Sequence, residues 1–212
     1  MTNVESAWQP QVGPQLSAIC SGECIDELFF GGAAGGGKSD FLLGDFAQDL
    51  WQGSDHIGIL FRRHSTDLDE IIRRSLLIYP HLGGEFKVGV KTWKFQSGSE
   101  LLLRYMDSDN DFIRYLGSQF SWIGWDELPT WDSLRPYNMM KSRLRGKAKH
   151  KRIRASGNPG GRSHGAVKRY WAIDKYPQGG VPLKDKASGM VRCFLPSKVS
   201  DNKILLDSDP DY

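Results

Sequence analysis

A glycine-rich segment followed by a lysine and a serine, residues 31–39, is the part of this sequence best suited to chemistry. Residues 32–39 fit the pattern G-x-x-x-x-G-K-S, which is typical of a P-loop, a backbone turn that wraps around phosphate groups. Because glycine has no Cβ, such a turn can point its N–H groups at phosphate oxygens. An apolar run precedes the segment and a helix-like pattern follows it, so a helix N-terminus would face the same anion. We therefore predict a phosphate-binding turn rather than a glycine-rich surface linker.

The side chains at the end of this turn have distinct expected roles. Lys38 would place a positive charge on the β- and γ-phosphates of a nucleotide, and Ser39 would offer its hydroxyl to Mg²⁺. The expected phosphate-binding residues are Gly32, Ala33, Ala34, Gly35, Gly36, Gly37, Lys38, Ser39 and Asp40.

Two adjacent acids, Asp126 and Glu127, end a mostly apolar run and form the second candidate centre. The pattern matches a Walker B strand, whose consecutive side chains point to opposite faces, so the two acids would have different tasks. Asp126 would hold Mg²⁺ beside Ser39, usually through water, and Glu127 would be the general base for water attacking the γ-phosphate. Acids capping a helix N-terminus are the alternative. The P-loop pattern about ninety residues earlier favours the Walker B interpretation.

Other polar residues follow predicted strands or begin helices. Arg62 and Arg63 end a buried β-like run, where ligands of parallel sheets bind. Arg62 could sense phosphate there, with a surface arginine pair as an equal alternative. Asn158 follows another predicted strand and could respond to the γ-phosphate. Gln15, near the start of a short helix, could contact the edge of adenine, and an exposed helix-start glutamine explains it equally well.

The densest basic run, residues 141–152, admits three interpretations. It could bind DNA phosphates, offer an arginine to the nucleotide of a neighbouring subunit, or form a solvated loop. Because the formal net charge is only +3, a nucleic-acid partner would have to be bound by a local patch rather than by the whole surface.

The pattern of the chain predicts an α/β fold with a central, mostly parallel sheet flanked by helices. Short alternating runs over residues 86–105 predict a β-meander at one edge of the sheet. We expect strands near 26–30, 56–61, 120–127, 153–156 and 190–195, and helices over 38–51, 66–78, 131–144 and 165–173. Residues 1–195 would form the domain, beginning with an extended arm over 1–13, and residues 196–212 would form a tail or linker.

Composition places few further limits on function. A length of 212 residues suits one sizeable α/β domain, and 39% hydrophobic residues are ordinary for a globular protein. Of the three cysteines, Cys20 and Cys24 have no second pair to complete a zinc site, so a reduced protein is expected. The sequence shows no apolar run long enough for a membrane span and no signal peptide.

Taken in order, these stretches resemble the ATPase domain of the large terminase subunit, the DNA-packaging motor protein of tailed bacteriophages. The resemblance covers nearly the whole chain. It rests on the motifs G-G-A-A-G-G-G-K-S at 31–39, L-F-R-R at 60–63, I-G-W-D-E-L at 123–128, K-S-R-L-R at 141–145 and S-G-N-P at 156–159, and on the closing segment 201–212.

The resemblance implies a RecA-like P-loop fold with an extra strand that carries the catalytic glutamate. It implies ATP and Mg²⁺ as ligands, with Lys38 and Ser39 on phosphate and metal, Asp126 on Mg²⁺, Glu127 as base and Asn158 in coupling. Gln15 would match the adenine-contacting glutamine of that family. Implied partners are double-stranded DNA, the portal protein and procapsid, and the small terminase subunit. Subunits would form a ring in the cytoplasm of an infected bacterium.

Two departures from the family pattern matter. Several members carry an arginine inside the P-loop or just before the glycine that precedes the Walker B strand, and here Leu116 precedes Gly117. The arginine finger therefore stays open among Arg62, Arg114, Arg143 and Arg145. Full-length members also continue into a nuclease domain with an acidic metal cluster, so we expect this chain to act as the motor half and not to cleave DNA.

Two other functional classes share part of this pattern. A RecA-like helicase fragment would show a similar P-loop and acid pair, but the S-G-N-P turn and the closing segment favour a terminase. A nucleotide-dependent switch or small-molecule kinase is the other class. A guanine-nucleotide switch normally carries Asn-Lys-x-Asp, whereas Asn202-Lys203 is followed here by Ile204 and Leu205.

Overall fold

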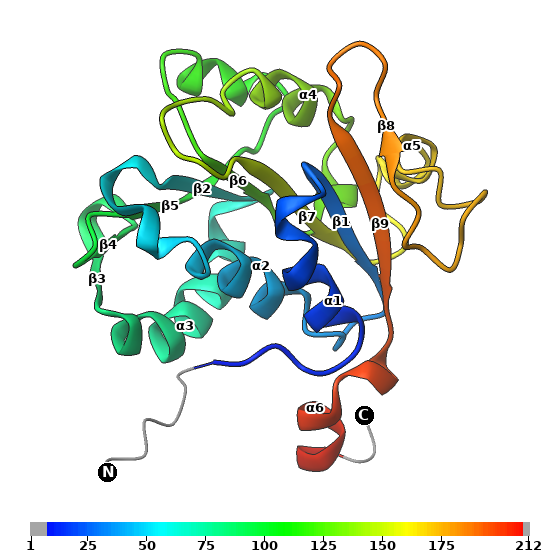
Figure 1. The fold of residues 1–212 in the computed structure, drawn as a ribbon, viewed down its shortest axis with the longest axis horizontal. Coiled ribbons are helices and arrows are strands. Elements are labelled where there is room, and N and C mark those ends of the chain that lie inside the picture. The colour runs from blue at the N-terminus through cyan, green and yellow to red at the C-terminus, as the bar shows by residue number, and fades with distance from the viewer. Residues whose placement is uncertain (1–7, 210–212) are drawn as a thin grey trace.

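A nine-stranded sheet runs through the molecule in a computed structural model that describes residues 8–209 (Figure 1). Its strand order is β3-β4-β5-β2-β6-β7-β1-β9-β8. The strands are β1 (Glu27–Gly32), β2 (Ile57–Arg62), β3 (Gly84–Lys87), β4 (Thr92–Phe95), β5 (Glu100–Tyr105), β6 (Trp122–Trp125), β7 (Arg152–Gly157), β8 (Leu183–Lys184) and β9 (Val191–Ser197). Strands β5, β2, β6, β7, β1 and β9 pair in parallel, and the outer pairs are antiparallel. The predicted parallel sheet with an edge meander is confirmed.

Helices cover both faces of the sheet. They are α1 (Pro14–Cys20), α2 (Lys38–Ala47), α3 (Leu68–Ile78), α4 (Arg135–Lys141), α5 (His164–Tyr170) and α6 (Lys203–Ser208). Helices α1, α2 and α3 share one hydrophobic cluster, and α4 and α5 share a second cluster with the other face of the strands. None of the helices within residues 8–209 combines the length and the hydropathy needed to cross a bilayer.

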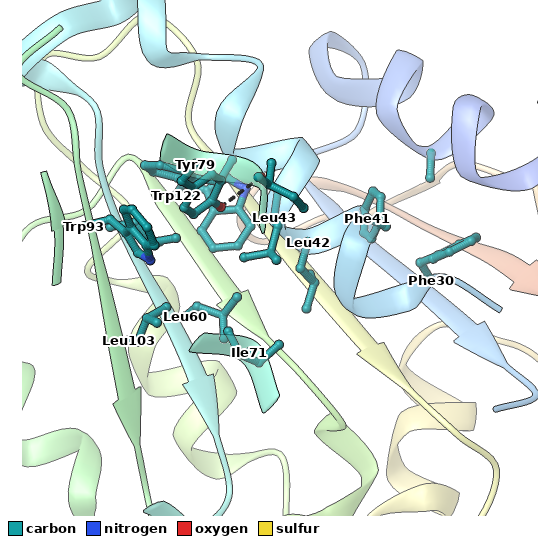
Figure 2. Packing of buried hydrophobic residues seen from close by; sticks show 14 of the residues in the cluster. Phe30, Phe41, Leu42, Leu43, Leu60, Ile71, Tyr79, Trp93, Leu103 and Trp122 are labelled. Carbon is teal, nitrogen blue, oxygen red and sulfur yellow. Dashed lines mark hydrogen bonds between the residues drawn. The ribbon is translucent and has the colours of Figure 1, made fainter. Parts of the chain in front are cut away.

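Burial on both faces explains why the central strands are continuous apolar runs rather than alternating ones. In β1, Phe30 points into the cluster under α1–α3, while its neighbour Phe29 points into the cluster under α4 and α5. Figure 2 shows the first of these clusters, where Leu43 of α2 and Ile71 of α3 pack with Leu60 of β2.

The carboxyl ends of β1, β2, β6 and β7 meet at one edge of the sheet. Strand β7 is inserted between β1 and β6 and carries Ser156 and Gly157 at its end. The expectation that the extra strand would carry the glutamate is wrong, because Glu127 follows β6. Both strands nevertheless deliver polar residues to the same edge.

Some element boundaries differ from the sequence-based expectations. Helix α4 begins only at Arg135, because Trp131 has an extended backbone (ψ 158°) and Pro136 occupies the first turn, where proline is tolerated. Strand β9 continues to Ser197, and residues 199–208 form two short helices. In the predicted N-terminal arm, residues 1–7 lie outside the described residues, and Trp8 packs against the cluster under α1–α3. At the other end, residues 210–212 also lie outside them.

Buried ion pairs fix helix α2, which begins at the glycine-rich turn, over the central strands. Asp45 of α2 is fully buried and accepts hydrogen bonds from Arg154 Nε (2.9 Å) on β7 and Trp122 Nε1 (2.8 Å) on β6. A buried carboxylate without these partners would be strongly unfavourable. The pairing therefore sets the orientation of α2 and of the turn before it.

His56, directly before β2, is a buried histidine with two hydrogen-bond partners and a stacking partner. Its Nε2 lies 3.0 Å from the Phe46 carbonyl and its Nδ1 lies 3.0 Å from Ser121 Oγ, while its ring stacks on Phe46 at 4.4 Å. Burial lowers the pKa of His56 from 6.5 to about 4, against opposing effects of the Phe46 carbonyl and Asp45. The folded protein therefore holds this ring neutral.

This neutral histidine makes stability depend on pH. Because the unfolded chain takes up a proton near pH 6.5 and the folded chain does not, the free energy of unfolding should fall by about 1.5 kcal/mol between pH 6.5 and pH 5. Chemical denaturation at both pH values measures this difference. His56→Gln should remove most of it, and His81→Gln, at an exposed position, should not. An unchanged pH dependence in His56→Gln would contradict the assignment.

Candidate active site

A cavity of about 690 Å³ opens at the edge of the sheet where β1, β2, β6 and β7 end. Most of the predicted site residues line it, namely Ala34, Gly35, Gly36, Gly37, Lys38, Ser39, Asp40, Arg62, Glu127 and Asn158. Four predicted residues, Gln15, Gly32, Ala33 and Asp126, do not line it directly. The structure thus gathers predicted residues that are up to 124 positions apart at one site, counting from Ala34 to Asn158.

The glycine-rich turn between β1 and α2 has the backbone that its sequence predicts. Gly35 and Gly37 have φ of 75° and 70°, the left-handed region that glycine adopts readily. Lys38 Nζ donates to the Ala33 carbonyl, so in this structure the ammonium group folds back onto the turn. Burial lowers the pKa of Lys38, while the charges of Glu127 and Asp126 oppose that effect.

Two amide side chains bind the turn from outside. Gln15 Nε2 donates to the Gly37 carbonyl at 2.9 Å, and Asn202 Nδ2 donates to the Gly35 carbonyl. The Gln15 Oε1 accepts from the Gln11 backbone N–H at 2.7 Å. Gln15 therefore braces the turn in this structure, and the glutamine that lines the cavity is Gln11.

Asp126 connects three elements around the cavity. Its side chain is fully buried. Its Oδ2 accepts a hydrogen bond from Ser39 Oγ (3.2 Å) at the start of α2, and its Oδ1 accepts one from Ser156 Oγ of β7. The same Oδ2 lies 2.7 Å from Arg62 Nε at the end of β2. Both carboxylate oxygens of Asp126 therefore already have protein partners.

Glu127 reaches the cavity by a backbone turn and not by strand alternation. Strand β6 ends at Trp125, and Glu127 adopts φ 58° and ψ 43°, a left-handed conformation that is uncommon for a residue other than glycine. The expectation that opposite strand faces separate the two acids is therefore wrong. The Asn158 backbone N–H and its Nδ2 each donate to one Glu127 oxygen, both at 3.1 Å.

The electrostatics of Glu127 suit a group that accepts a proton. Burial raises its pKa above the usual 4.5, and the charge of Asp126 raises it further. The Asn158 backbone N–H, Lys38 and Arg62 act in the opposite direction. A carboxylate with a raised pKa is a better general base near neutral pH than an ordinary one.

Arg62 lies between two acids. It is 8% exposed, and its Nη2 donates to Glu70 Oε2 (2.9 Å) of α3 while its Nε faces Asp126. Burial would lower the pKa of Arg62, but the charges of Asp126, Glu70 and Glu127 outweigh burial and raise it. The guanidinium therefore stays charged.

Helix α3 supplies two cavity residues that sequence reasoning missed. Glu70 pairs with Arg62, and Arg74 Nε lies 2.5 Å from Asp40 Oδ1. Their spacing of four places them on one helix face. The four-residue spacing of Glu70 and Arg74 was the signal in the sequence that could have indicated a site. Acids early and arginines late in a helix also complement the helix dipole, and that explanation was sufficient without a site. Asn202, Ile204 and Leu205 were missed as lining residues as well.

Of the four candidates for an arginine finger, only Arg62 lines the cavity. Arg114 pairs with Asp111 three residues earlier. Arg143 donates to the Leu116 carbonyl. Residues 143–145 pair with Phe120, next to the start of β6 and therefore at the opposite edge of the sheet. The basic run is thus separated from this chain's cavity.

The donors and acceptors of the cavity fit a phosphate ligand with a divalent cation. Arg62 Nε and Asn158 Oδ1 are buried and have no aligned hydrogen-bond partner, which buried polar atoms seldom lack. Because both atoms are buried, a ligand oxygen or a water molecule would satisfy them only after the side chains had moved. The Ser39 hydroxyl and the Asp126 carboxylate are oxygen donors of the kind that Mg²⁺ prefers.

Comparison with solved structures identifies the fold. The structure of the large terminase from a thermophilic bacteriophage matches 92% of this chain with a TM-score of 0.65 and 14% sequence identity. The same protein in complex with ADP matches with a TM-score of 0.67, again at 14% identity. This chain covers 47% of those chains, about half of their length. Neither a protein-family model nor a curated protein sequence matches it. The resemblance to large terminases is confirmed for the fold.

The geometry predicts a structural role for Ser156. Its hydroxyl donates to Asp126 Oδ1 and accepts from the Glu127 backbone N–H at 3.3 Å. Ser156→Ala should lower the free energy of unfolding by about 1–3 kcal/mol, because a buried carboxylate oxygen loses its partner. Denaturant titration measures the loss. Ser142→Ala, at an exposed position, is the control, and equal stability of the two variants would contradict this role.

Proposed function

We propose that this chain is the ATPase motor domain of a terminase large subunit, which hydrolyses ATP to drive double-stranded DNA into a procapsid. The observation that carries the proposal is the meeting of Lys38, Ser39 and Glu127 around one cavity at the carboxyl edge of a terminase-like sheet, with Asp126 hydrogen-bonded to Ser39. The proposed domain would include β9 to Ser197 and the segment that carries Asn202, Ile204 and Leu205, because these residues line the cavity.

The side chains around the cavity can divide the reaction between them. Backbone N–H groups of the turn and Lys38 would bind the phosphates, and Ser39 and Asp126 would hold Mg²⁺, whose charge would stabilise the phosphoryl oxygens. Glu127 would orient the attacking water and accept its proton. Arg62 would provide a positive charge to the γ-phosphate from within the same chain.

Asn158 is placed to link the phosphate to the base. In the structure its amide and backbone N–H bind both oxygens of Glu127, and its own Oδ1 lacks a partner. A carboxylate held by two hydrogen bonds is less free to accept a proton. Binding of the γ-phosphate or water by Asn158 would release Glu127, which would be the coupling step expected of the S-G-N-P turn.

The base contact would come from a different glutamine than the sequence suggested. Gln15 donates a hydrogen bond to the Gly37 carbonyl of the turn, whereas Gln11 lines the cavity together with Ile204 and Leu205. We propose that these three residues form the side of the site that accepts adenine. Double-stranded DNA, a portal and procapsid, and a small terminase subunit would be partners of a subunit ring in the cytoplasm of an infected bacterium.

Measurement of ATP hydrolysis with and without linear duplex DNA, portal and procapsid tests the proposed function. Stimulation by these components is expected of a packaging motor. Stimulation by single-stranded DNA alone would instead indicate a helicase, and the absence of any hydrolysis in all combinations would contradict the proposal.

Glu127→Gln tests the general base. The variant should bind ATP like the original chain and hydrolyse it about 10²-fold more slowly or worse, because the amide cannot accept a proton. Single-turnover hydrolysis and nucleotide binding are the two measurements. Glu85→Gln, at an exposed position of β3, should leave both unchanged, and full activity of Glu127→Gln would exclude the assigned role.

Lys38→Ala tests the phosphate assignment. The variant should lose nucleotide affinity itself, since the ammonium charge contacts phosphate rather than water. Calorimetric titration with ADP measures the affinity. Lys87→Ala is the matched control, since Lys87 lies on an edge strand and pairs with the exposed Glu85. Equal affinities of the two variants would be inconsistent with a phosphate-binding lysine.

A further inference from the structure

The carboxylate of Asp126 is already surrounded by partners. Ser156 occupies Oδ1, and Ser39 and Arg62 both approach Oδ2, at 3.2 Å and 2.7 Å. The Asp126 side chain is fully buried and does not line the cavity, so a ligand cannot reach Oδ2 in this arrangement. A metal-bound water could reach Oδ2 only if one of them moved.

Of these two groups, Arg62 is the one that conflicts with a divalent cation. Ser39 is neutral and can donate to Asp126 while its oxygen faces a metal. The guanidinium of Arg62 is a second positive charge at the same oxygen, and like charges repel strongly where water is scarce. Its contact with Asp126 is also poorly aligned. Although Arg62 Nε lies 2.7 Å from Asp126 Oδ2, the Nε–H does not form a hydrogen bond with that oxygen.

A second position for the guanidinium already exists. Glu70 of α3 accepts from Arg62 Nη2 at 2.9 Å, and its side chain is 65% exposed at the cavity. Arg62 can therefore leave Asp126 and keep an acidic partner. Asp126 itself is fully buried and needs a cation in either state, since an unpaired buried charge is costly.

We propose that Arg62 and Mg²⁺ compete for Asp126, so that the guanidinium closes the metal site until a metal–nucleotide complex displaces it toward Glu70. The inference rests on the proposed function and adds to it a role for Arg62 and Glu70 before catalysis. Displacement would move the Arg62 Nε–H, which is buried against Asp126 without a hydrogen-bond acceptor, to where it could donate to a phosphate oxygen. A permanent brace of Arg62 between the two acids is the opposing account, and the two differ in how Mg²⁺ affects nucleotide affinity.

The test compares the affinity for a fluorescent ADP, mant-ADP, in Mg²⁺ and in EDTA. Fluorescence titration gives both dissociation constants. We call the ratio of the constant in EDTA to the constant in Mg²⁺ the metal effect, because it measures how much the metal strengthens binding. The affinity of Mg²⁺ for free nucleotide is the same for every variant and cancels between them. ADP avoids the γ-phosphate contact that Arg62 would make in ATP. Arg169→Gln, at an exposed position of α5, is the control.

Competition predicts opposite effects of two variants. Arg62→Gln removes the competing charge, so the metal effect should rise about tenfold, because no buried ion pair has to be broken. Glu70→Gln removes the second acid and holds Arg62 on Asp126, so the metal effect should fall below that of the original chain. Glu70 is largely exposed, so this variant tests the proposal even if Arg62→Gln fails to fold.

Other outcomes would overturn the proposal. Equal metal effects in both variants and the control would make Arg62 a permanent brace, and a smaller effect in Arg62→Gln would mean that the arginine assists the metal. Either result would leave the proposed ATPase intact, because mant-ADP would still bind. Failure of the original chain to bind mant-ADP in either buffer would remove the proposed function and this inference together.

Discussion

The burial of one carboxylate, Asp126, is the constraint on which the candidate site depends. A fully buried charge needs partners on every side, and here they come from the start of α2, the end of β2 and the end of β7. These three elements are far apart in the sequence, and their ends meet around Asp126, which follows β6 between β2 and β7. The same contacts that satisfy the charge therefore bring the glycine-rich turn, an arginine and the S-G-N-P turn to one cavity.

The order of the strands makes this meeting possible. Because β7 lies between β1 and β6, Asn158 stands between the phosphate-binding turn and Glu127, where it binds both carboxylate oxygens. The buried pair of Asp45 with Arg154 and Trp122 holds α2 over β6 and β7. Stability and site geometry thus depend on the same helix–strand contacts. A substitution that breaks these contacts should lower the stability of the fold and also disturb the site.

The sequence predicted the parts of the site whose chemistry is local. The glycine-rich turn and the two acids follow from residue types within single stretches, and the parallel sheet follows from apolar runs that end in polar residues. Residues placed by long-range packing were not predictable in this way. Asn202 reaches the Gly35 carbonyl across 167 positions, and Glu70 and Arg74 depend on how the crossover helix α3 returns over the sheet.

Some residues lie elsewhere than the sequence suggested, and each difference has a physical cause. Gln11 and Gln15 are four residues apart with the same side chain, and only the packing of α1 decides which faces the cavity. Glu127 was assigned to a strand, but a left-handed turn sets its direction. Arg143 and Arg145 lie next to the start of β6, away from this chain's own cavity, so they stay candidates only for the nucleotide of a neighbouring subunit.

A crystal structure with Mg²⁺, ADP and aluminium fluoride would test the central claim most directly. The account predicts the metal beside Ser39 and Asp126, a water molecule between the fluoride and Glu127, and Arg62 turned from Asp126 toward the fluoride. A nucleotide bound elsewhere, or a fluoride out of reach of Glu127, would contradict it.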